Sequence, residues 1–505
     1  MSSRGEESKY WKLPKFLALQ STTSDDHRNN RYLRYMRKAE GEDLHQHLQF
    51  SEKEIVKPWS KFEVEPSSSL DKRGSQQLVH IKCCYNNKYW SRGSESSHWI
   101  VASANEAQED QSLWSCTLFL PIFLDSKRVR FKHVQSGFYL SLSGGPSPHI
   151  DCLFANRGSD GGTFLVIDWD SLVILPTYVA FKGDNGMYLK AFEINRRNHN
   201  LQFSTENDTD IAVGNEIFPT GDDHGSIRIK SIRFNLFWKT VPTTRRSLSL
   251  FKASTRNWIQ ADAGNESAAQ LFLPRRVADS DNTITLHLLG TGTPCRRLTS
   301  HGKKDCLAAL SPTAKEDHMK VEECVKERVI TNVRYHYSDV RIFSKKINRV
   351  FIQTGKNRNK EAEDTMTFKY TSGRKRTSTW KSSITKKVAA TVKIKAGIPL
   401  PVPAFAEFAI AGETDKQYAW EEAKELSEGH EASYTATIPA NKTVEIYATE
   451  EEVSYDIPYT YDQLDTLHDG TVISKKDMDD GIYSCKYCYN YKFESDVVTD
   501  DKQSS

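Results

Sequence analysis

The segment Ile81-Lys-Cys-Cys-Tyr-Asn-Asn-Lys-Tyr-Trp90 decides the fold of the first two-thirds of the chain, because it returns as Ile229-Lys-Ser-Ile-Arg-Phe-Asn-Leu-Phe-Trp238. Other segments return at nearly the same offset, which drifts as loop insertions and deletions would cause. These matched pairs are Leu48–Ser51 with Leu201–Ser204, His98–Ile100 with Asn257–Ile259, Leu118–Pro121 with Leu271–Pro274, and Asp151–Leu153 with Asp305–Leu307. Two homologous domains of about 150 residues are therefore expected, over 10–170 and 172–325, after a flexible N-terminus at 1–9.

Each of these domains is itself threefold. An aromatic residue followed by an apolar one recurs about every 50 residues, among short β-like runs separated by Gly, Asn and Ser turns. The pairs are Tyr32-Leu33, Tyr89-Trp90 and Tyr139-Leu140 in the first domain, and Tyr188-Leu189, Phe237-Trp238 and a degraded copy near Arg297-Leu298 in the second. Three subrepeats of a few short strands each predict an all-β chain that begins with two tandem β-trefoil domains.

The matched segments also carry the chemistry of a carbohydrate site. A sugar offers an apolar CH face and a rim of hydroxyls, so its site pairs an aromatic platform with Asn, Asp or His. The candidate residues are Tyr85, Asn86, Asn87, Tyr89, Trp90, His98 and Trp99 in the first domain and Arg233, Asn235, Trp238, Asn257 and Trp258 in the second. Phe234 replaces Asn86 and Leu236 replaces Lys88 in the second copy, which weakens the case for a separate site there. The alternative for the four tryptophans is barrel core, because they are what the two copies share.

The Tyr85–Trp90 segment with His98-Trp99 behind it resembles the amaranthin-type agglutinin domain of plants, and the resemblance covers about 10–325. It implies tandem β-trefoils that bind galactose/N-acetylgalactosamine-type glycans and glycoproteins. It also implies a homodimer through the agglutinin domains, with the glycan between unlike domains, so a weakened copy could still form one wall. The chain departs from the ricin-type trefoil, since no Gln-x-Trp repeat runs through the subrepeats.

Beyond about residue 325 the pattern changes to long, Ser/Thr-rich strands. From Thr379 to Ala396 apolar side chains occupy alternate positions, well beyond the five or six residues of an ordinary strand. Gly397–Pro403 interrupts this alternation as a turn-like tip, and Ala404–Ala411 forms a second arm. We therefore expect 326–505 to be an elongated antiparallel β domain that contains a long amphipathic hairpin.

Such a hairpin has the pattern of a membrane-crossing pair of strands, with Ile, Val and Ala toward lipid and Thr and Lys toward a wet lumen. Lys386 breaks the alternation, so the lipid-facing arms are expected at Val388–Ala396 and Ala404–Ala411, close to the ~9–11 residues that a tilted strand requires. The candidate insertion residues are Val388, Val392, Ile394, Ile398, Leu400, Val402, Phe405, Phe408 and Ile410. The alternative is a solvated strand pair in a β-rich stalk.

This tail resembles the aerolysin-like pore-forming fold in its Ser/Thr-rich arms, in Gly397-Ile-Pro399 and in the strand Thr443-Val-Glu-Ile-Tyr447. Agglutinin domains followed by such a tail resemble plant chimerolectins. That resemblance implies glycan docking, a ring-shaped homo-oligomer, release of the hairpin into a shared β-barrel, and a role in plant defence. Two alternatives remain: a glycan-binding stress or signalling lectin whose tail only oligomerises, and an adaptor whose trefoils bind protein.

Composition excludes several other classes. Hydrophobic residues make up 38% of the 505 and charged residues 27%, as in soluble globular proteins. The net charge of +3 includes no long single-sign block, which argues against a nucleic-acid partner. Met1–Ser8 lacks the apolar region of a signal peptide, and the nine cysteines are odd in number. We expect a cytoplasmic or nucleocytoplasmic protein with reduced thiols that associates with membranes after activation.

No motif points to catalysis, a cofactor or a metal. Cys485-Lys-Tyr-Cys488 has metal-ligand spacing but lacks a second pair nearby. Gly290-Thr-Gly-Thr-Pro-Cys295 lacks the third glycine and the helix of a dinucleotide loop, and no second histidine follows His430-Glu431 at metalloprotease spacing. The chain is expected not to be an enzyme.

Overall fold

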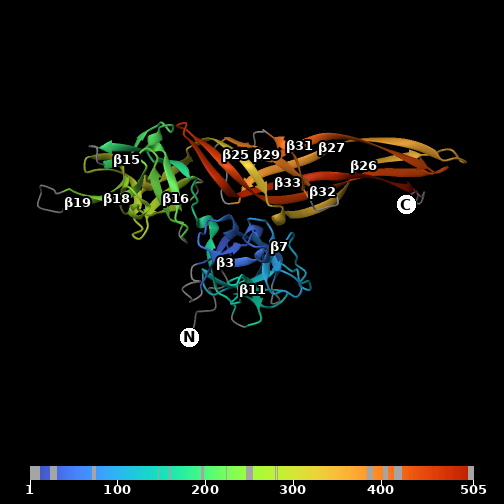
Figure 1. Ribbon diagram of the computed structural model, residues 1–505, viewed down its shortest axis with the longest axis horizontal. Coiled ribbons are helices and arrows are strands. Elements are labelled where there is room, and N and C mark those ends of the chain that lie inside the picture. Colours follow the sequence, from blue (N-terminus) through green and yellow to red (C-terminus); the bar gives the residue numbers. More distant parts are fainter. Residues whose placement is uncertain are drawn as a thin grey trace. The chain divides into compact units, whose positions relative to one another are not determined.

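The computed structural model describes residues 12–22, 31–70, 76–145, 147–158, 161–194, 198–222, 225–245, 254–278, 280, 282–383, 391–401, 408–414 and 423–498. It divides into two compact units, the first made of 1–329, 384–392 and 462–476 and the second of 330–383, 393–461 and 477–505. Throughout the described ranges the regular structure is β-strand apart from three-residue 3-10 turns (Figure 1), so the all-β prediction is confirmed. These turns are η2 (Lys38–Glu40), η3 (Glu42–Leu44), η4 (Pro58–Ser60), η5 (Trp169–Ser171), η6 (Ile211–Val213), η7 (Glu266–Ala268), η8 (Lys315–Asp317) and η9 (Tyr337–Asp339).

The first twelve strands form one antiparallel sheet that follows a threefold plan. Strands pair as β1–β4, β5–β8 and β9–β12, and the three groups are joined by β4–β5, β8–β9 and β12–β1. The strands are β1 (Phe16–Ser21), β2 (Tyr32–Tyr35), β3 (Leu48–Glu52), β4 (Phe62–Leu70), β5 (Gln77–Cys83), β6 (Tyr89–Arg92), β7 (Ile100–Ala104), β8 (Phe119–Phe123), β9 (Arg128–His133), β10 (Tyr139–Leu142), β11 (Leu153–Asn156) and β12 (Phe164–Asp168). The repeated aromatic-apolar pairs open β2, β6 and β10.

The next twelve strands repeat that plan, with groups joined by β16–β17, β20–β21 and β24–β13. They are β13 (Tyr178–Gly183), β14 (Tyr188–Ile194), β15 (Asn198–Thr205), β16 (Asn215–Pro219), β17 (Ile227–Ser231), β18 (Leu236–Arg245), β19 (Ser254–Ala263), β20 (Phe272–Arg276), β21 (Thr283–Leu288), β22 (Pro294–Ser300), β23 (Lys303–Ala309) and β24 (Met319–Glu323). Each copy encloses its own hydrophobic core, and matched tryptophans, Trp90 and Trp238, lie in the two cores with no exposed surface.

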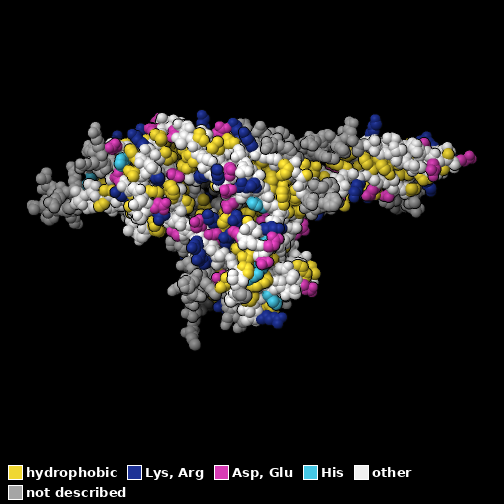
Figure 2. Space-filling model, in the orientation of Figure 1, with side chains coloured by type: hydrophobic (Ala, Val, Ile, Leu, Met, Phe, Trp, Pro, Cys, Tyr) yellow, Lys and Arg dark blue, Asp and Glu magenta, His cyan; other side chains and the backbone are white. Residues whose placement is uncertain are grey.

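Seven of the remaining strands build one sheet, and all of them except β28 are longer than the strands of the first two domains. Its order is β28-β25-β32-β33-β27-β31, with β26 also paired to β32, and β32 and β33 run for 25 and 27 residues. The strands are β25 (Val325–Tyr335), β26 (Arg341–Lys356), β27 (Asp364–Ser382), β28 (Thr391–Ile394), β31 (Lys424–Ile438), β32 (Thr443–Leu467) and β33 (Val472–Val498). On the face drawn in Figure 2, hydrophobic side chains form a band along these long strands.

A separate two-stranded sheet pairs β29 (Ala396–Pro401) with β30 (Phe408–Thr414). The prediction that Gly397–Pro403 forms the tip of the hairpin is therefore wrong, because 397–401 is strand. Pro399 and Pro401 are tolerated there because β29 pairs on one side only among the described residues, and proline is compatible with an edge strand. The predicted strand Thr379–Ala396 is also broken, since β28 and β29 are separated at Lys395.

Two further observations concern the whole described chain. No helix in the described ranges is long and apolar enough to cross a membrane. All nine cysteines lie in those ranges, and they are buried and outside any disulfide bond.

Candidate functional site

Part of the predicted carbohydrate cluster lies inside the first domain. Tyr85 and Trp90 are 2% and 0% exposed in the core, where the Trp90 indole meets the rings of Phe62 and Phe119 edge-on. The hydroxyl of Tyr89 donates to a carboxylate oxygen of Glu65 at 2.6 Å. A ligand cannot reach the faces of Tyr85 or Trp90 while this core is packed.

The two neighbouring asparagines shape the turn between β5 and β6. The Asn86 side chain donates to the carbonyl of Ala102 at 3.0 Å and accepts from the backbone N–H of Lys88 at 3.0 Å. Asn87 has a φ of 56°, and Asn235 at the same place in the second copy has a φ of 55°. Asparagine adopts this left-handed conformation more readily than most residues, so the turn itself explains its presence in both copies.

The remaining second-domain candidates are spread over several elements. Trp238 is fully buried in the core, and Asn257 is exposed on β19. The Arg233 guanidinium lies 5.3 Å from the Phe234 ring centre, and it donates to the carbonyl of Ala191 at 3.4 Å. The structure therefore brings no compact set of these residues to one surface.

Trp99 and Trp258 belong to a different place, where three hairpins of each domain meet. In the first domain β3, β7 and β11 are bridged by His47↔Val101, Gln49↔Cys152 and Trp99↔Phe154. In the second domain the same bridges are Asn200↔Gln260, Gln202↔Cys306 and Trp258↔Ala308. We call these junctions the first cap (His47, Trp99 and His149) and the second cap (Asn200, Trp258 and Lys303).

The first cap is a cluster of three half-buried rings. His149 stacks on Trp99, with ring centres 5.2 Å apart and planes inclined by 24°. His47 meets both rings edge-on, at 5.7 Å from Trp99 and 5.0 Å from His149. Burial, followed by the charge of His149, lowers the pKa of His47 below its ordinary value, so its imidazole is neutral at pH 7. The predicted residue His98 lies beside Phe138 instead, with ring centres 5.8 Å apart.

The second cap is filled by its own polar side chains. The Lys303 ammonium lies 4.9 Å from the Trp258 ring centre and donates to the side-chain oxygen of Asn200 at 2.5 Å. The Gln260 amide contacts the same oxygen at 2.8 Å, and Trp258 is only 1% exposed. Desolvation lowers the pKa of Lys303. A ligand would have to displace a lysine here to reach the indole.

From the sequence we identified the tryptophans of the two caps but not the side chains that pack beside them, His47 and His149 in the first cap and Asn200 and Lys303 in the second. His47 and Asn200 stand 153 residues apart, and His149 and Lys303 stand 154 apart, the offsets at which matched segments return. The signal was therefore available in the repeat, but these residues do not match in type. Aligning the two copies and inspecting the positions beside a shared tryptophan would have found them.

Three of the six predicted insertion residues that the structure describes are buried. Val392, Ile394 and Ile398 are 1%, 1% and 2% exposed, Leu400 is half-buried, and Ile410 is 56% exposed. Their alternation with the more accessible Lys393 is as expected. Val388, Val402 and Phe405, like Lys386, lie outside the described residues.

Aromatic side chains hold this hairpin in the second unit. The hydroxyl of Tyr335 donates to the carbonyl of Gly397 at 2.7 Å, and that of Tyr455 donates to the carbonyl of Pro399 at 2.6 Å. Phe408 stacks on Tyr337 with ring centres 5.4 Å apart and meets the ring of Tyr455 at 5.1 Å. Burial raises the pKa of Tyr455 well above its ordinary value, so its hydroxyl remains a donor at physiological pH.

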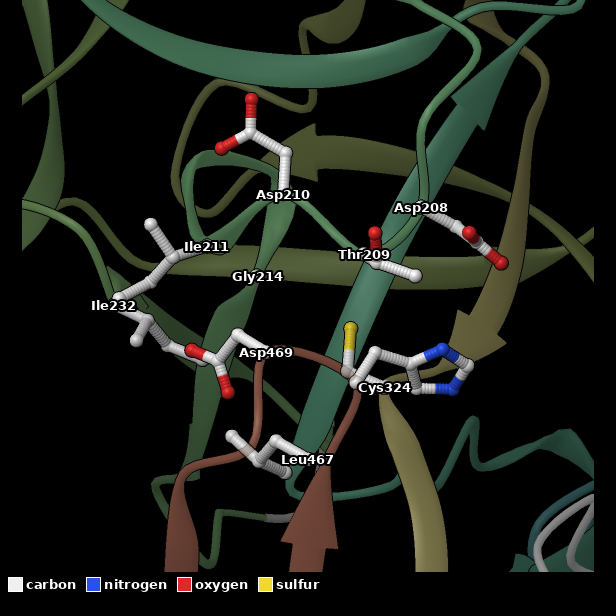
Figure 3. Close-up of a pocket in the computed structure, with 10 residues that line it drawn as sticks. Asp208, Thr209, Asp210, Ile211, Gly214, Ile232, Cys324, Leu467 and Asp469 are labelled. Atoms are coloured by element: carbon white, nitrogen blue, oxygen red, sulfur yellow. The ribbon is translucent and has the colours of Figure 1, made fainter.

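The first unit contains a pocket lined by residues that include Asp208, Cys324 and Leu467, and this pocket cannot hold a sugar (Figure 3). Its volume is about 10 Å³, roughly that of a single water site. The carboxylates of Asp208, Asp210 and Asp469 point in different directions in Figure 3, and Asp210 pairs with Lys190 at 2.7 Å. No group of three or more His, Cys, Asp or Glu side chains in the described ranges could hold a metal ion.

Comparison with known proteins assigns the first two-thirds of the chain. The family model described as the agglutinin domain matches residues 12–168 and 173–321, more than half of the chain. The search of curated proteins found no match.

Similar solved structures include the lamprey immune protein, at 13% identity and a TM-score of 0.29, covering 74% of this chain and 87% of that one. The hemolytic lectin CEL-III is 8% identical with a TM-score of 0.28, covering 94% and 93%. The aerolysin-like protein of Bombina maxima is 11% identical with a TM-score of 0.24, covering 34% and 99%. These TM-scores are low, so the assignment rests on the family model: the chain belongs to the agglutinin-domain family and carries two copies of that domain in tandem.

Proposed function

We propose that this protein is a carbohydrate-binding lectin that brings a pore-forming module to membranes bearing its glycans. The two agglutinin domains supply the binding part. We take both as β-trefoils of the amaranthin type, in line with the threefold pairing of β1–β12 and β13–β24. Galactose/N-acetylgalactosamine-type glycans and glycoproteins are the proposed ligands.

The β29–β30 hairpin is the observation that supports membrane insertion. The described backbone of β29 and β30 is paired within the hairpin and outside the seven-stranded sheet, so detaching these two strands breaks side-chain contacts rather than a strand ladder. Each of the two tyrosine hydrogen bonds stabilises the docked hairpin by about 0.5–1.5 kcal/mol. Their sum is small compared with the stabilisation from the many backbone hydrogen bonds of a long paired strand. We propose that the aerolysin-like tail releases this hairpin.

The released arm has enough length to cross a bilayer. Residues 391–401 comprise eleven positions from Thr391 to Pro401, and at ~3.3 Å each with a tilt of ~45° they span about 26 Å. The first four of these residues form β28, so release of the whole arm also requires the short β28–β25 pairing to open. Strands in lipid need every backbone group paired, so hairpins from several copies would close a shared β-barrel. Ring-shaped homo-oligomers, and homodimers through the agglutinin domains, are the proposed assemblies.

The wider setting is also a proposal. A cytoplasmic or nucleocytoplasmic chain that reaches membranes after activation fits nine buried cysteines without a disulfide bond. A role in plant defence, without enzymatic activity or nucleic-acid binding, completes the proposed function as a chimerolectin.

Two measurements in sequence test this function. A glycan array of the full chain should show binding to galactose- or N-acetylgalactosamine-terminated glycans, and dye-loaded liposomes carrying those glycans should then leak. Absence of glycan binding would contradict the lectin proposal. Binding without leakage, even after proteolytic trimming, would leave a glycan-binding lectin whose tail only oligomerises.

Matched variants separate hairpin insertion from other causes of leakage. Ile410→Lys places a charge on the proposed lipid-facing arm, where a lysine costs about 2–4 kcal/mol near mid-membrane. Ile352→Lys alters an equally accessible isoleucine of β26, since the two are 56% and 58% exposed. We expect Ile410→Lys to abolish leakage with glycan binding intact, and Ile352→Lys to leak as the wild type does.

A further inference from the structure

The two caps occupy equivalent places but differ in what covers the tryptophan. An imidazole lies over Trp99 in the half-buried first cap, whereas an ammonium hydrogen-bonded to Asn200 lies over the buried Trp258. We propose that the first cap is a carbohydrate subsite, in which a neutral hexopyranose takes the place of His149 on the face of Trp99. This inference rests on the lectin function proposed above and names where in the first domain the sugar binds.

Trp99 supplies the platform, and its present cover has the geometry of a stacked ligand. The His149 ring lies 5.2 Å from the indole at 24°, the offset-stacked arrangement in which a flat apolar face binds an aromatic ring. The CH face of a pyranose has similar width and can stack in the same way. His149 is therefore a side chain that a sugar can replace on this surface.

The loop that carries His149 is anchored independently of the imidazole. The Gln49 amide donates to the carbonyls of Pro148 at 3.1 Å and Ile150 at 2.9 Å, on both sides of the histidine. Among the described residues the imidazole has one polar contact, in which its Nε2 lies 3.2 Å from the carbonyl of Asp43 at the protein surface. The ring can therefore rotate away from Trp99 while the loop backbone stays in place.

His47 offers the polar contact that a sugar hydroxyl needs. Its Nε2 is buried and has no hydrogen-bond partner among the described residues, while its Nδ1 lies 3.4 Å from the carbonyl of His45. An unsatisfied buried polar atom is destabilising, and a sugar hydroxyl placed over Trp99 would give this nitrogen a partner. The neutral imidazole favoured by burial can pair with a hydroxyl in either direction.

The test is calorimetric titration of the full chain with N-acetylgalactosamine and with methyl β-galactoside. We expect His47→Ala to weaken binding about tenfold through loss of one buried hydrogen bond. The matched variant Asn200→Ala, at the equivalent position of the second cap, should stay within about twofold of the wild type, because it is distant from the proposed subsite. His149→Ala should bind more tightly, because the platform is already vacant.

A measurement on the unaltered protein guards against misfolded variants. Modification of histidines by diethyl pyrocarbonate, read by mass spectrometry, should slow at His47 and accelerate at His149 when sugar is present. Equal affinities for the His47→Ala variant and the wild type, or a weaker affinity for His149→Ala, would overturn the subsite and leave the lectin function standing. A wild-type chain that binds no glycan at all would overturn both.

Discussion

The two agglutinin domains share one backbone topology, yet the tryptophan at the cap is half-buried in the first domain and fully buried in the second. Trp258 is sealed beneath Lys303 and has 1% of its surface exposed, while Trp99 is half-buried beneath the imidazole of His149. The strand bridges that place the two residues are the same. The position of the tryptophan ring is therefore the same in both domains. The residues beside it differ, with His47 and His149 in the first domain and Asn200 and Lys303 in the second, and they decide whether the ring is buried or accessible.

Truncating the two tryptophans should show the largest difference. Trp258→Ala removes a buried side chain packed against Cys306 and Ala308, and we expect it to cost about 3–5 kcal/mol. Trp99→Ala removes a half-buried ring, and we expect about 1–2 kcal/mol. Urea denaturation of the full chain, followed separately for each domain by hydrogen exchange, measures both. Equal losses would break the distinction between a sealed cap and an open one.

Acid should weaken the first domain through His133. This histidine is fully buried, and burial lowers its pKa from 6.5 to about 4. The unfolded chain binds the proton first, so stability is present above pH 6.5, falls as the pH drops toward 4, and has lost about 3 kcal/mol below that. The midpoint of first-domain thermal unfolding, measured between pH 7 and 4, checks this.

His133→Gln should flatten that pH dependence, because the titrating group is gone. His287 stands 154 residues later on β21 and provides the matched variant, His287→Gln, which should leave the first domain's dependence unchanged. An unchanged slope in His133→Gln would refute the assignment of acid sensitivity to that imidazole.

Truncating the side chains that lie over the two cap tryptophans should change the free energy of unfolding least. Lys303→Ala loses an ammonium over an indole and a hydrogen bond to Asn200, which together contribute about 1–2 kcal/mol. His149→Ala loses a stacking contact worth about 0.5–1 kcal/mol. Acrylamide quenching of tryptophan fluorescence should rise in both variants. A His149→Ala variant less stable than Lys303→Ala would reverse the comparison.

The internal repeat made most of the fold predictable. Tyr32, Tyr89 and Tyr139 mark the first residues of β2, β6 and β10, because the same hairpin starts at this point of each subrepeat. The residues that follow them, Leu33, Trp90 and Leu140, lie in the hydrophobic core. Alternation in the tail likewise predicted that Val392 and Ile394 share one face of a strand, since side chains of a strand point to opposite sides in turn, and the structure has both of them buried.

The candidate site was harder to predict, for physical reasons. Asn87 and Asn235 resemble sugar ligands in the sequence, but a positive φ at both positions gives them a backbone role that residue type alone does not reveal. The cap assembles His47, Trp99 and His149 from hairpins about 50 residues apart, so no local motif contains them. The predicted position of the hairpin tip was wrong because Pro399 and Pro401 are typical of a turn, although an edge strand also accepts proline.

Glycan-dependent leakage tests the central claim most directly. Two sets of dye-loaded liposomes of the same lipid composition would differ only in the terminal sugar of one glycolipid, galactose or glucose. The account predicts that the full chain empties the galactose-bearing vesicles, that free N-acetylgalactosamine blocks the release, and that the glucose-bearing vesicles stay sealed. Equal release from both sets, or release from neither despite binding to the galactose-bearing set, would contradict a lectin-targeted pore.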